Sequence, residues 1–167
     1  MNRIRICALA LTAFALVSAP RRASAQDGGL AIGSSIPNAM VQTLDGKTVP
    51  LNSAIGTGPA VIEFWAAWCE NCEQLLPALQ KAEAKYRGKV KFVGVAVSVN
   101  ETPNRVRLHV AKHKVPGAQF FDYSGDATEK WEVPATSHVV VIDKKGKVVY
   151  TGVGGDQDIE AAIRKAL

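Results

Sequence analysis

Cysteine is scarce in this sequence, which has three in 167 residues: Cys7, Cys69 and Cys72. So few cysteines exclude a small secreted domain held together by a disulfide framework. Internal repeats and low-complexity tracts are also missing, and no apolar run reaches the about 20 residues that a membrane-spanning helix needs. What remains is a chain of ordinary composition that is long enough to bury a full core. The sequence therefore predicts one globular domain.

The first 25 residues are typical of a secretory signal peptide. They begin with positive charge, continue as an uncharged apolar run over residues 6–19, and end in a small-x-small cleavage pattern at residues 23–25. The apolar run is short for a membrane span. We therefore expect cleavage before Gln26 and an exported, periplasmic protein whose domain spans residues 26–167.

Removal of this segment changes what the charge and the cysteines mean. Four arginines and no acidic residue precede Gln26, so the net charge falls from +5 to +1. The excess of positive charge comes from the targeting segment, so it does not predict a nucleic-acid partner. Cys7 is lost as well, and the two cysteines that remain in an exported chain are redox-active or metal-binding. Arg21 and Arg22 work against export, so an uncleaved membrane anchor facing the periplasm is the alternative.

The two remaining cysteines form a Cys-x-x-Cys motif after a predicted buried strand. Residues 60–65 are a continuous apolar run interrupted only by Glu63, typical of a central strand covered on both faces. The motif follows, and residues 70–87 have helical periodicity. A turn between them places Cys69 at the helix N-terminus, where unpaired N–H groups and the helix dipole favour a thiolate. A thiolate beside a second thiol, that of Cys72, exchanges disulfides, so the motif predicts redox chemistry.

The rest of the chain alternates strands with helices. The turn Asp45-Gly46 predicts a hairpin between residues 39–41 and 47–51. The later segments are predicted to be a strand at 90–99, a helix from Thr102 and Pro103 to 114, a strand at 119–123, a helix at 126–131, strands at 138–142 and 148–151, and a last helix capped by Asp156. This order indicates an α/β fold with a central mixed sheet and helices on both faces.

Residues 64–72, with Pro77 five residues after Cys72, resemble the active-site segment of the thioredoxin superfamily. The hairpin and the segments 100–130 and 141–149 are more specifically similar to TlpA/ResA-type exported thiol-disulfide oxidoreductases, over residues 31–167. The resemblance implies a thioredoxin-like three-layer sandwich with an N-terminal β-hairpin. It also implies a protein disulfide reductase without a cofactor, monomeric, with clients that carry cysteine pairs. A membrane electron donor of the DsbD or CcdA type is implied too, with cytochrome c maturation as one destination.

The same resemblance assigns roles to three side chains. Cys69 is expected to be the nucleophile and Cys72 the resolving cysteine, one turn inside the helix and shielded. Glu63 occupies the position of the buried acid behind the thioredoxin active site. A carboxyl group buried under a sheet has a raised pKa and can take the proton of Cys72 as a general base. An edge-facing or salt-bridged Glu63 is the alternative.

The side of the site opposite the cysteines departs from the superfamily pattern. That pattern has a cis-proline just before the third central strand, and the candidate here is Pro134. The spacing from the Lys145-Gly146 turn points instead to Ser137. We expect Thr136 and Ser137 to face the disulfide, while a longer loop that brings Pro134 there stays open.

The residues beside the cysteines are expected to meet the client and to set the reduction potential. Trp68 is predicted to form a partly exposed lip, next to Glu70 and Asn71. Glu70 and Glu73 put negative charge near the sulfurs, which disfavours the thiolate and makes the couple more reducing. This charge favours a reductase.

A thioredoxin-like copper chaperone is the alternative function. Two thiolates, from Cys69 and Cys72, with the imidazole of His138 would suit Cu(I). Related copper chaperones, however, have three residues between their cysteines. His109 and His113 are four apart on a predicted helix and could bind a metal, but neighbouring lysines favour a solvated basic face.

Two other classes fit the sequence less well. A peroxidase on this scaffold usually has a threonine three residues before its reactive cysteine, where this chain has Ala66. A redox-silent interaction domain is at odds with an intact Cys-x-x-Cys motif.

Overall fold

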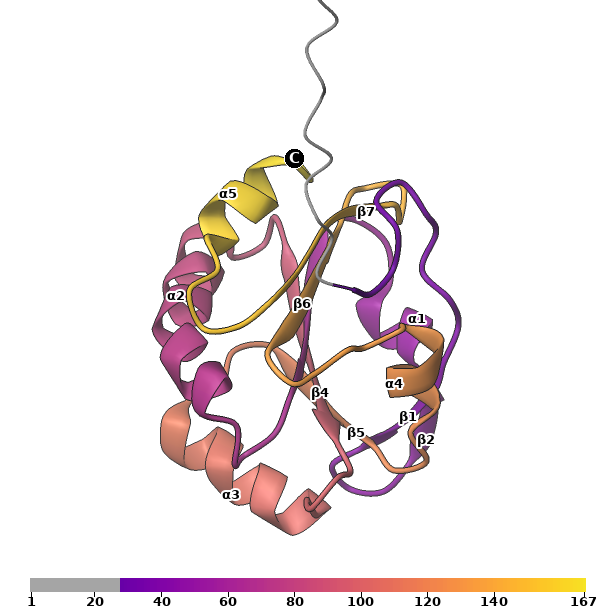
Figure 1. The fold of residues 1–167 in the computed structure, drawn as a ribbon, viewed down its shortest axis with the longest axis vertical. Coiled ribbons are helices and arrows are strands. Elements are labelled where there is room, and N and C mark those ends of the chain that lie inside the picture. The colour runs from indigo at the N-terminus through magenta and orange to yellow at the C-terminus, as the bar shows by residue number, and fades with distance from the viewer. Residues whose placement is uncertain (1–27) are drawn as a thin grey trace, which may run out of the picture.

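A single mixed sheet runs through the middle of the computed structural model, which describes residues 28–167 (Figure 1). The expected signal peptide and its cleavage site lie outside the described residues. The elements are β1 (Met40–Thr43), β2 (Thr48–Pro50), α1 (Leu51–Ile55), β3 (Ala60–Trp65), α2 (Glu70–Tyr86), β4 (Lys91–Val97), α3 (Pro103–His113), β5 (Ala118–Asp122), α4 (Asp126–Lys130), β6 (His138–Ile142), β7 (Val148–Val153) and α5 (Ile159–Arg164). Over these residues the strand order is β2-β1-β5-β4-β3-β6-β7.

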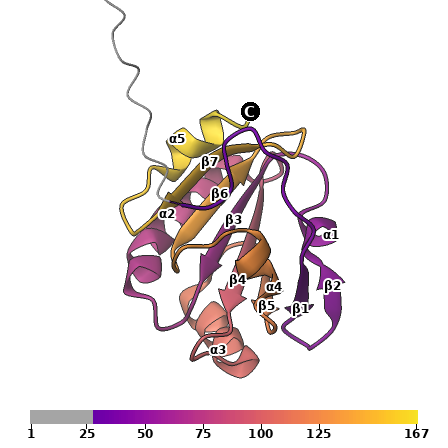
Figure 2. The same ribbon diagram turned by 45° about the vertical axis from the view of Figure 1, so that its right-hand side comes forward.

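Helices cover both faces of the sheet, so the predicted three-layer sandwich is confirmed. Figures 1 and 2 show α2 and α5 on one face and α1 and α4 on the other. α3 lies beside α2, because Gln80 Nε2 donates to the backbone oxygen of His113 over 2.9 Å. The buried apolar side chains form two clusters, one containing α1 and α4 and the other α2 and α5.

The central strand β3 positions the site. All six of its residues are buried, because β4 pairs with it in parallel on one side and β6 in antiparallel on the other. The continuous apolar run predicted this strand with the correct bounds. Its carboxyl end leads directly into α2, and the cysteines lie at this junction.

Local sequence signals set several element boundaries. The predicted hairpin is present as β1 and β2, paired in antiparallel. Thr102 caps α3 by accepting from the Arg105 backbone N–H, with Pro103 in the first turn, as predicted. Within residues 28–167, no helix combines the length and apolarity needed to cross a bilayer.

Several strand ends shift by one or two residues from the predictions, and two features differ more. Residues 51–55 form the short helix α1, which five residues were too few to reveal by periodicity. The cap of α5 is Asp158, whose Oδ1 accepts from the Ala161 backbone N–H over 2.8 Å, and not Asp156. The Asp156 carboxylate instead accepts from Gln74 Nε2 on α2 over 2.6 Å, so it ties the loop before α5 to the active-site helix.

Candidate active site

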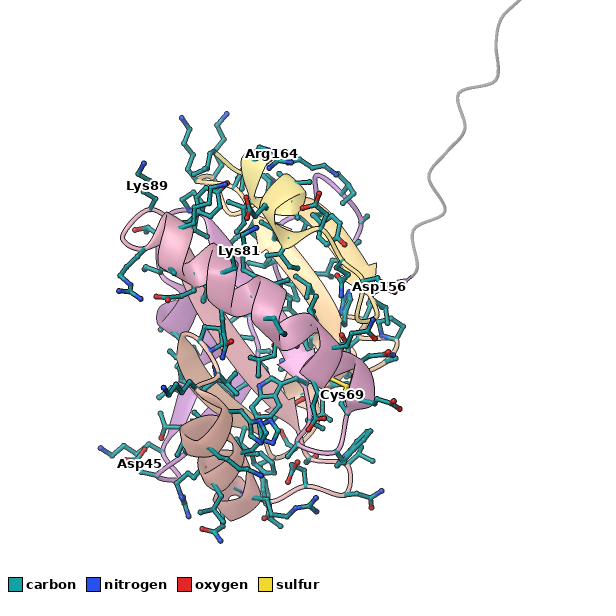
Figure 3. The ribbon with its side chains drawn as sticks, turned by 90° about the vertical axis from the view of Figure 1, so that its left-hand side faces the viewer. Asp45, Cys69, Lys81, Lys89, Asp156 and Arg164 are labelled. Atoms are coloured by element: carbon teal, nitrogen blue, oxygen red, sulfur yellow. A yellow bond between two sulfur atoms is a disulfide. The ribbon has the colours of Figure 1, made fainter. Side chains whose placement is uncertain are left out.

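Cys69 and Cys72 form a disulfide at the start of α2. Cys69 is the N-cap residue, and its sulfur accepts from the Cys72 backbone N–H over 3.1 Å. A sulfur in this place receives the unpaired N–H groups of the first turn, which favours negative charge on it. Figure 3 shows Cys69 at the end of α2, next to the loop that carries Asp156.

The expected difference in shielding between the cysteines is wrong for the disulfide form. Cys69 is 5% exposed and Cys72 7%. The cross-link holds both sulfurs against the same apolar cluster, so the two cysteines are almost equally buried although they lie one helical turn apart. What distinguishes them is the N-cap position, which Cys69 alone occupies.

Glu63 lies buried in β3, as predicted, and the salt-bridged alternative is wrong. Its Oε1 has no hydrogen-bond partner, and no ion pair to Glu63 is found among the described residues. Burial without a partner disfavours the charged form and raises the pKa of Glu63 to about 8. A carboxyl group with this pKa can hold or release a proton near neutral pH.

Glu63 borders a small cavity on the face covered by α2. The cavity holds about 10 Å³ of space for water and is also lined by Leu79, Gly94 and Pro116. This volume is on the order of one water molecule. It gives the Glu63 carboxyl group a place for a single water between β3 and α2.

A glycine beside Glu63 lets a glutamine lie across the sheet. Gly94 is paired with Glu63 on one side and with Gln119 on the other. A Cβ atom at Gly94 would overlap the Gln119 side chain. Gln119 Oε1 accepts from the indole N–H of Trp65 over 3.0 Å, so the absent side chain allows this contact. Trp65 is 2% exposed and belongs to the core, as its apolar surroundings require.

The loop after β4 contacts the motif, and no sequence pattern predicted this contact. Glu101 Oε2 accepts from the Ala67 backbone N–H over 2.8 Å, and the Val99 carbonyl oxygen accepts from the Trp68 indole over 2.9 Å. Each of these contacts joins residues more than thirty positions apart. The one available signal was an acidic residue directly before the helix cap Thr102, where a surface role is the simplest interpretation.

The lip beside the disulfide is exposed. Trp68 is 45% exposed and Val99 63%, and Glu70 and Asn71 also face solvent. A docked client would therefore meet an apolar patch next to two polar side chains.

The segment before β6 holds Ser137 and Pro134 in different ways. Ser137 is buried with φ of 62°, and its hydroxyl donates to the Gly154 carbonyl oxygen over 2.9 Å. It precedes His138, which pairs with Phe64, so Ser137 lies at the end of the sheet where the motif begins. Pro134 is exposed, and residues 28–167 contain no cis peptide bond. That Thr136 and Ser137 face a client stays a prediction.

The geometry does not support the copper alternative. Within residues 28–167, no three His, Cys, Asp or Glu side chains converge as metal ligands. His138 is fully buried, stacks on Phe64, and pairs through Nε2 with Thr151 Oγ1 at 2.6 Å. Burial lowers the pKa of His138 to about 4, so its imidazole is neutral. His138 is therefore part of the core.

The predicted solvated face at His109 and His113 is also wrong. The two rings stack with centroids 4.2 Å apart, and the His109 ring lies 5.3 Å from the Trp65 ring. Both side chains are half-buried, and desolvation lowers the pKa of His109. These histidines pack α3 against the core near the motif.

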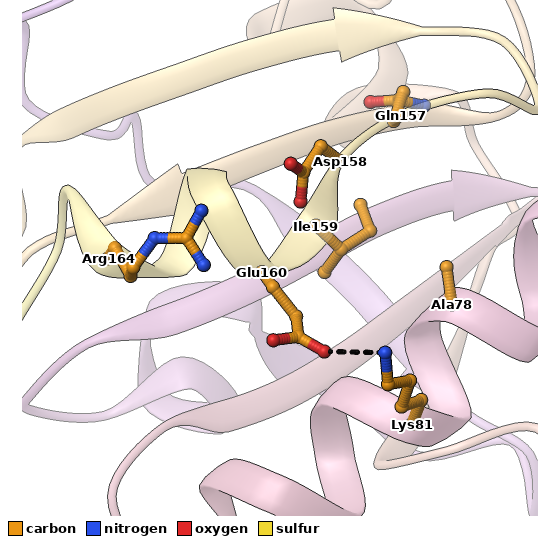
Figure 4. A pocket seen from close by; sticks show the side chains of 7 residues that line it. All are labelled: Ala78, Lys81, Gln157, Asp158, Ile159, Glu160 and Arg164. Atoms are coloured by element: carbon orange, nitrogen blue, oxygen red, sulfur yellow. Dashed lines mark ion pairs between the residues drawn. The ribbon is translucent and has the colours of Figure 1, made fainter.

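A larger hollow between α2 and α5 lies away from the sulfurs. Its lining includes Lys81, Glu160 and Arg164, with the Lys81–Glu160 ion pair at 3.1 Å across it (Figure 4). Neither cysteine lines it, and Figure 3 shows Lys81 well along α2 from Cys69. This hollow is therefore separate from the disulfide.

The disulfide lies at a helix N-terminus, directly after the central strand of a three-layer sandwich. A disulfide in this position needs only a partner thiol to exchange electrons. This arrangement defines the class of protein, a thiol-disulfide oxidoreductase of the thioredoxin fold. The chain belongs to the Redoxin family, which matches residues 31–167. The prediction of a ResA/TlpA-like member of the thioredoxin superfamily is confirmed.

Particular relatives agree with this assignment. The thiol-disulfide oxidoreductase ResA of Bacillus thuringiensis subsp. konkukian (strain 97-27) is 30% identical over 129 residues, which cover 77% of this chain and 73% of that protein. Among solved structures, DsbF of Mycobacterium tuberculosis has a TM-score of 0.65 at 27% identity, covering 79% of this chain and 97% of that one. The thioredoxin domain of a Bacteroides vulgatus thiol-disulfide oxidoreductase has a TM-score of 0.70 at 22% identity, covering 83% and 99%, and shows the shared fold.

Proposed function

We propose that the protein is a disulfide reductase that passes two electrons from a Cys69–Cys72 dithiol to cysteine pairs of client proteins outside the cytoplasm. The observation that carries the proposal is the disulfide at the N-terminus of α2, with Cys69 as the N-cap residue. A sulfur there is the better nucleophile of the pair, because the helix N-terminus favours its thiolate.

The first step is attack by the Cys69 thiolate on a client disulfide. A new bond forms between Cys69 Sγ and one client sulfur, the client disulfide breaks, and the other client sulfur leaves as a thiolate that takes a proton. The product is a mixed disulfide. The exposed Trp68 ring lies beside the attacking sulfur and offers the client an apolar contact.

The second step releases the client. The Cys72 thiol loses its proton to the Glu63 carboxylate, directly or through one water, and the Cys72 thiolate attacks Cys69 Sγ. The Cys69–Cys72 disulfide forms, and the client sulfur leaves as a thiolate that is protonated. Two electrons have moved to the client. Support for Glu63 as the base comes from its burial and its raised pKa.

Acidic side chains beside the sulfurs favour reduction as the direction. Glu70 and Glu73 lie in the first turn of α2, and both are exposed. Their negative charge disfavours the Cys69 thiolate and so stabilises the disulfide form of this protein relative to its dithiol. A couple of this kind gives electrons to clients.

The client is proposed to lie across the exposed lip formed by Trp68, Glu70 and Asn71. On the other side of the disulfide, Thr136 and Ser137 are the proposed contacts, with Pro134 as the alternative. The register of β6 against β3 supports this choice, since it brings Ser137 to the end of the sheet where the motif begins.

The protein is proposed to act in the periplasm, after cleavage before Gln26 or with the segment kept as an anchor. A disulfide reductase there needs electrons from across the membrane, so a donor of the DsbD or CcdA type is proposed, with cytochrome c maturation as one use. A solved relative of similar fold is described as a secreted disulfide oxidoreductase of Mycobacterium tuberculosis, which supports the location. One chain carries both cysteines, so a monomer is sufficient.

Trapping of the mixed disulfide tests the roles of the two cysteines. Cys72→Ser leaves the first step intact and removes the second, so it should accumulate a covalent adduct with a disulfide-bonded client on a non-reducing gel. Cys69→Ser should accumulate none, because the remaining thiol lacks the N-cap position that favours a thiolate. Equal adducts from both variants would contradict the assignment.

A further inference from the structure

The loop after β4 holds the turn that carries Cys69, and we propose that Glu101 is the positioning residue for the Cys69–Cys72 pair. This inference rests on the proposed exchange function. Residues 98–102 are called the bracket loop below. The bracket loop follows β4, precedes α3 and reaches the motif through one side chain and one carbonyl oxygen.

The Glu101 side chain is fully buried although it lies in a loop. Burying a carboxylate is costly unless it is hydrogen-bonded or paired. Glu101 Oε2 accepts from the Ala67 backbone N–H over 2.8 Å, and Oε1 accepts from the Thr102 backbone N–H over 3.0 Å. Arg105 Nε lies 3.5 Å from Oε1. Both oxygens are thus used, and one of them binds the turn before Cys69.

The bracket loop touches that turn at two adjacent residues. Ala67 is fixed by the Glu101 carboxylate, and the Trp68 indole is fixed by the Val99 carbonyl oxygen at 2.9 Å. The next residue is Cys69, whose backbone N–H donates to the Ala66 carbonyl oxygen over 3.1 Å. The chain on the N-terminal side of the sulfur is therefore held through the backbone at Ala66 and Ala67 and through the side chain at Trp68, by contacts that do not involve the disulfide.

The bracket loop is itself braced. Asn100 has φ of 51°, a conformation that a non-glycine residue rarely adopts without support. Arg105 Nη1 donates to the Asn100 carbonyl oxygen over 3.0 Å, and the Glu101 backbone N–H donates to the Ser98 carbonyl oxygen over 3.2 Å. These bonds connect the first turn of α3 to the motif through Glu101.

Fixed geometry matters most in the dithiol form, where no cross-link holds the sulfurs together. Formation of the disulfide is intramolecular, so its equilibrium depends on how often the two sulfurs lie within reach of each other. By holding Ala67, Glu101 keeps Cys69 Sγ over the first turn of α2, close to Cys72. Glu101 therefore raises the effective concentration of one thiol toward the other and makes the couple more reducing.

Equilibration of the purified protein with a glutathione redox buffer tests this role. Glu101→Ala should lower the equilibrium constant for disulfide formation on the order of tenfold, which corresponds to a rise in reduction potential of about 30 mV for a two-electron couple. Glu101→Gln keeps an oxygen that can accept from Ala67 but removes the charge, so its change should be about threefold or less. Glu129→Ala, which removes an exposed carboxylate on α4, is the matched control and should equal wild type.

The comparison separates positioning from charge and from stability. An alanine variant with the potential of wild type would overturn the proposal, even if it melts at lower temperature. Equal shifts in the alanine and glutamine variants would overturn it too, because charge alone would then explain them. A wild-type protein that does not exchange with glutathione would instead defeat the proposed function.

A measurement on the wild-type chain keeps the proposal testable if Glu101→Ala does not fold. Amide hydrogen exchange should find the Ala67 N–H protected in both the disulfide and the dithiol forms, because its acceptor is Glu101 and not the cross-link. If the Ala67 amide hydrogen of the dithiol form exchanges as fast as that of an exposed loop, Glu101 does not hold this turn and the proposal is overturned.

Discussion

At the scale of single residues, His138 and Glu63 are buried ionisable groups near the site that differ in what they can do. His138 is paired with Thr151 and its pKa is about 4, so it stays neutral over the working range of pH. Glu63 has no partner for Oε1, and its pKa is about 8. Of the two, only Glu63 can change protonation near neutral pH, which is what a general base requires.

The raised pKa of Glu63 predicts a pH-dependent stability. Between pH 4.5 and about 8 the folded protein keeps a proton that the unfolded chain has released, so stability falls as pH rises through this window. Glu63→Gln removes the effect. When the pH is raised from about 4 to about 9, the free energy of unfolding of the variant should rise relative to that of wild type by on the order of 2 to 5 kcal/mol.

Urea unfolding of the disulfide form at both pH values measures this difference. The exposed residue Glu129, changed to Gln, serves as the control and should track wild type. A constant gap between Glu63→Gln and wild type across the window would mean that the Glu63 carboxyl group titrates normally. In the exchange reaction, the same variant should slow the release of the client without slowing the first attack.

At the scale of elements, strong patterns were predicted well and weak ones were not. The strands β3 and β6 were predicted with correct bounds, because each is a continuous apolar run buried on both faces. The helix α1 was missed, since five residues do not reveal a period. The cap of α5 moved from Asp156 to Asp158 because Asp156 instead binds Gln74, a contact between residues 82 positions apart.

The same distinction separates the parts of the site. Cys69, Cys72 and Glu63 were proposed from the motif, from the strand before it and from the resemblance to the thioredoxin superfamily, all of which rest on one continuous segment. Glu101 was missed because its partner, Ala67, is 34 positions away, and the contact exists only once β4 lies beside β3. Residues that position a motif across a sheet leave no pattern within one segment of sequence.

The pairing of β3, β4 and β5 predicts the effect of a substitution at Gly94. In Gly94→Ala the added Cβ would overlap Gln119 and displace it from the Trp65 indole. We expect a loss of about 1 to 3 kcal/mol in the free energy of unfolding, measured with urea.

A double-mutant cycle identifies the cause of that loss. With Gln119→Ala already present, Gly94→Ala has no side chain to displace and should cost much less. An equal cost in both backgrounds would show that the backbone of β4, rather than the Gln119 side chain, excludes a larger residue.

At the scale of the whole molecule, three layers bring separate segments to one sulfur pair. β3 delivers the motif, α2 supplies its N-terminus, and the loop between β4 and α3 holds the turn from the side. The three-layer arrangement followed from the order of predicted elements. It places the only disulfide of residues 28–167 at the end of the central strand, where a client can approach.

The reduction potential of the Cys69–Cys72 pair is the decisive test of the proposed reductase. We predict that residues 26–167, equilibrated with a defined thiol buffer, have a potential well below that of glutathione, toward the value of thioredoxin at roughly −270 mV. That result would fit a reductase fed through the membrane. A potential near roughly −120 mV, as in a strong oxidant, would contradict the proposed direction of electron flow.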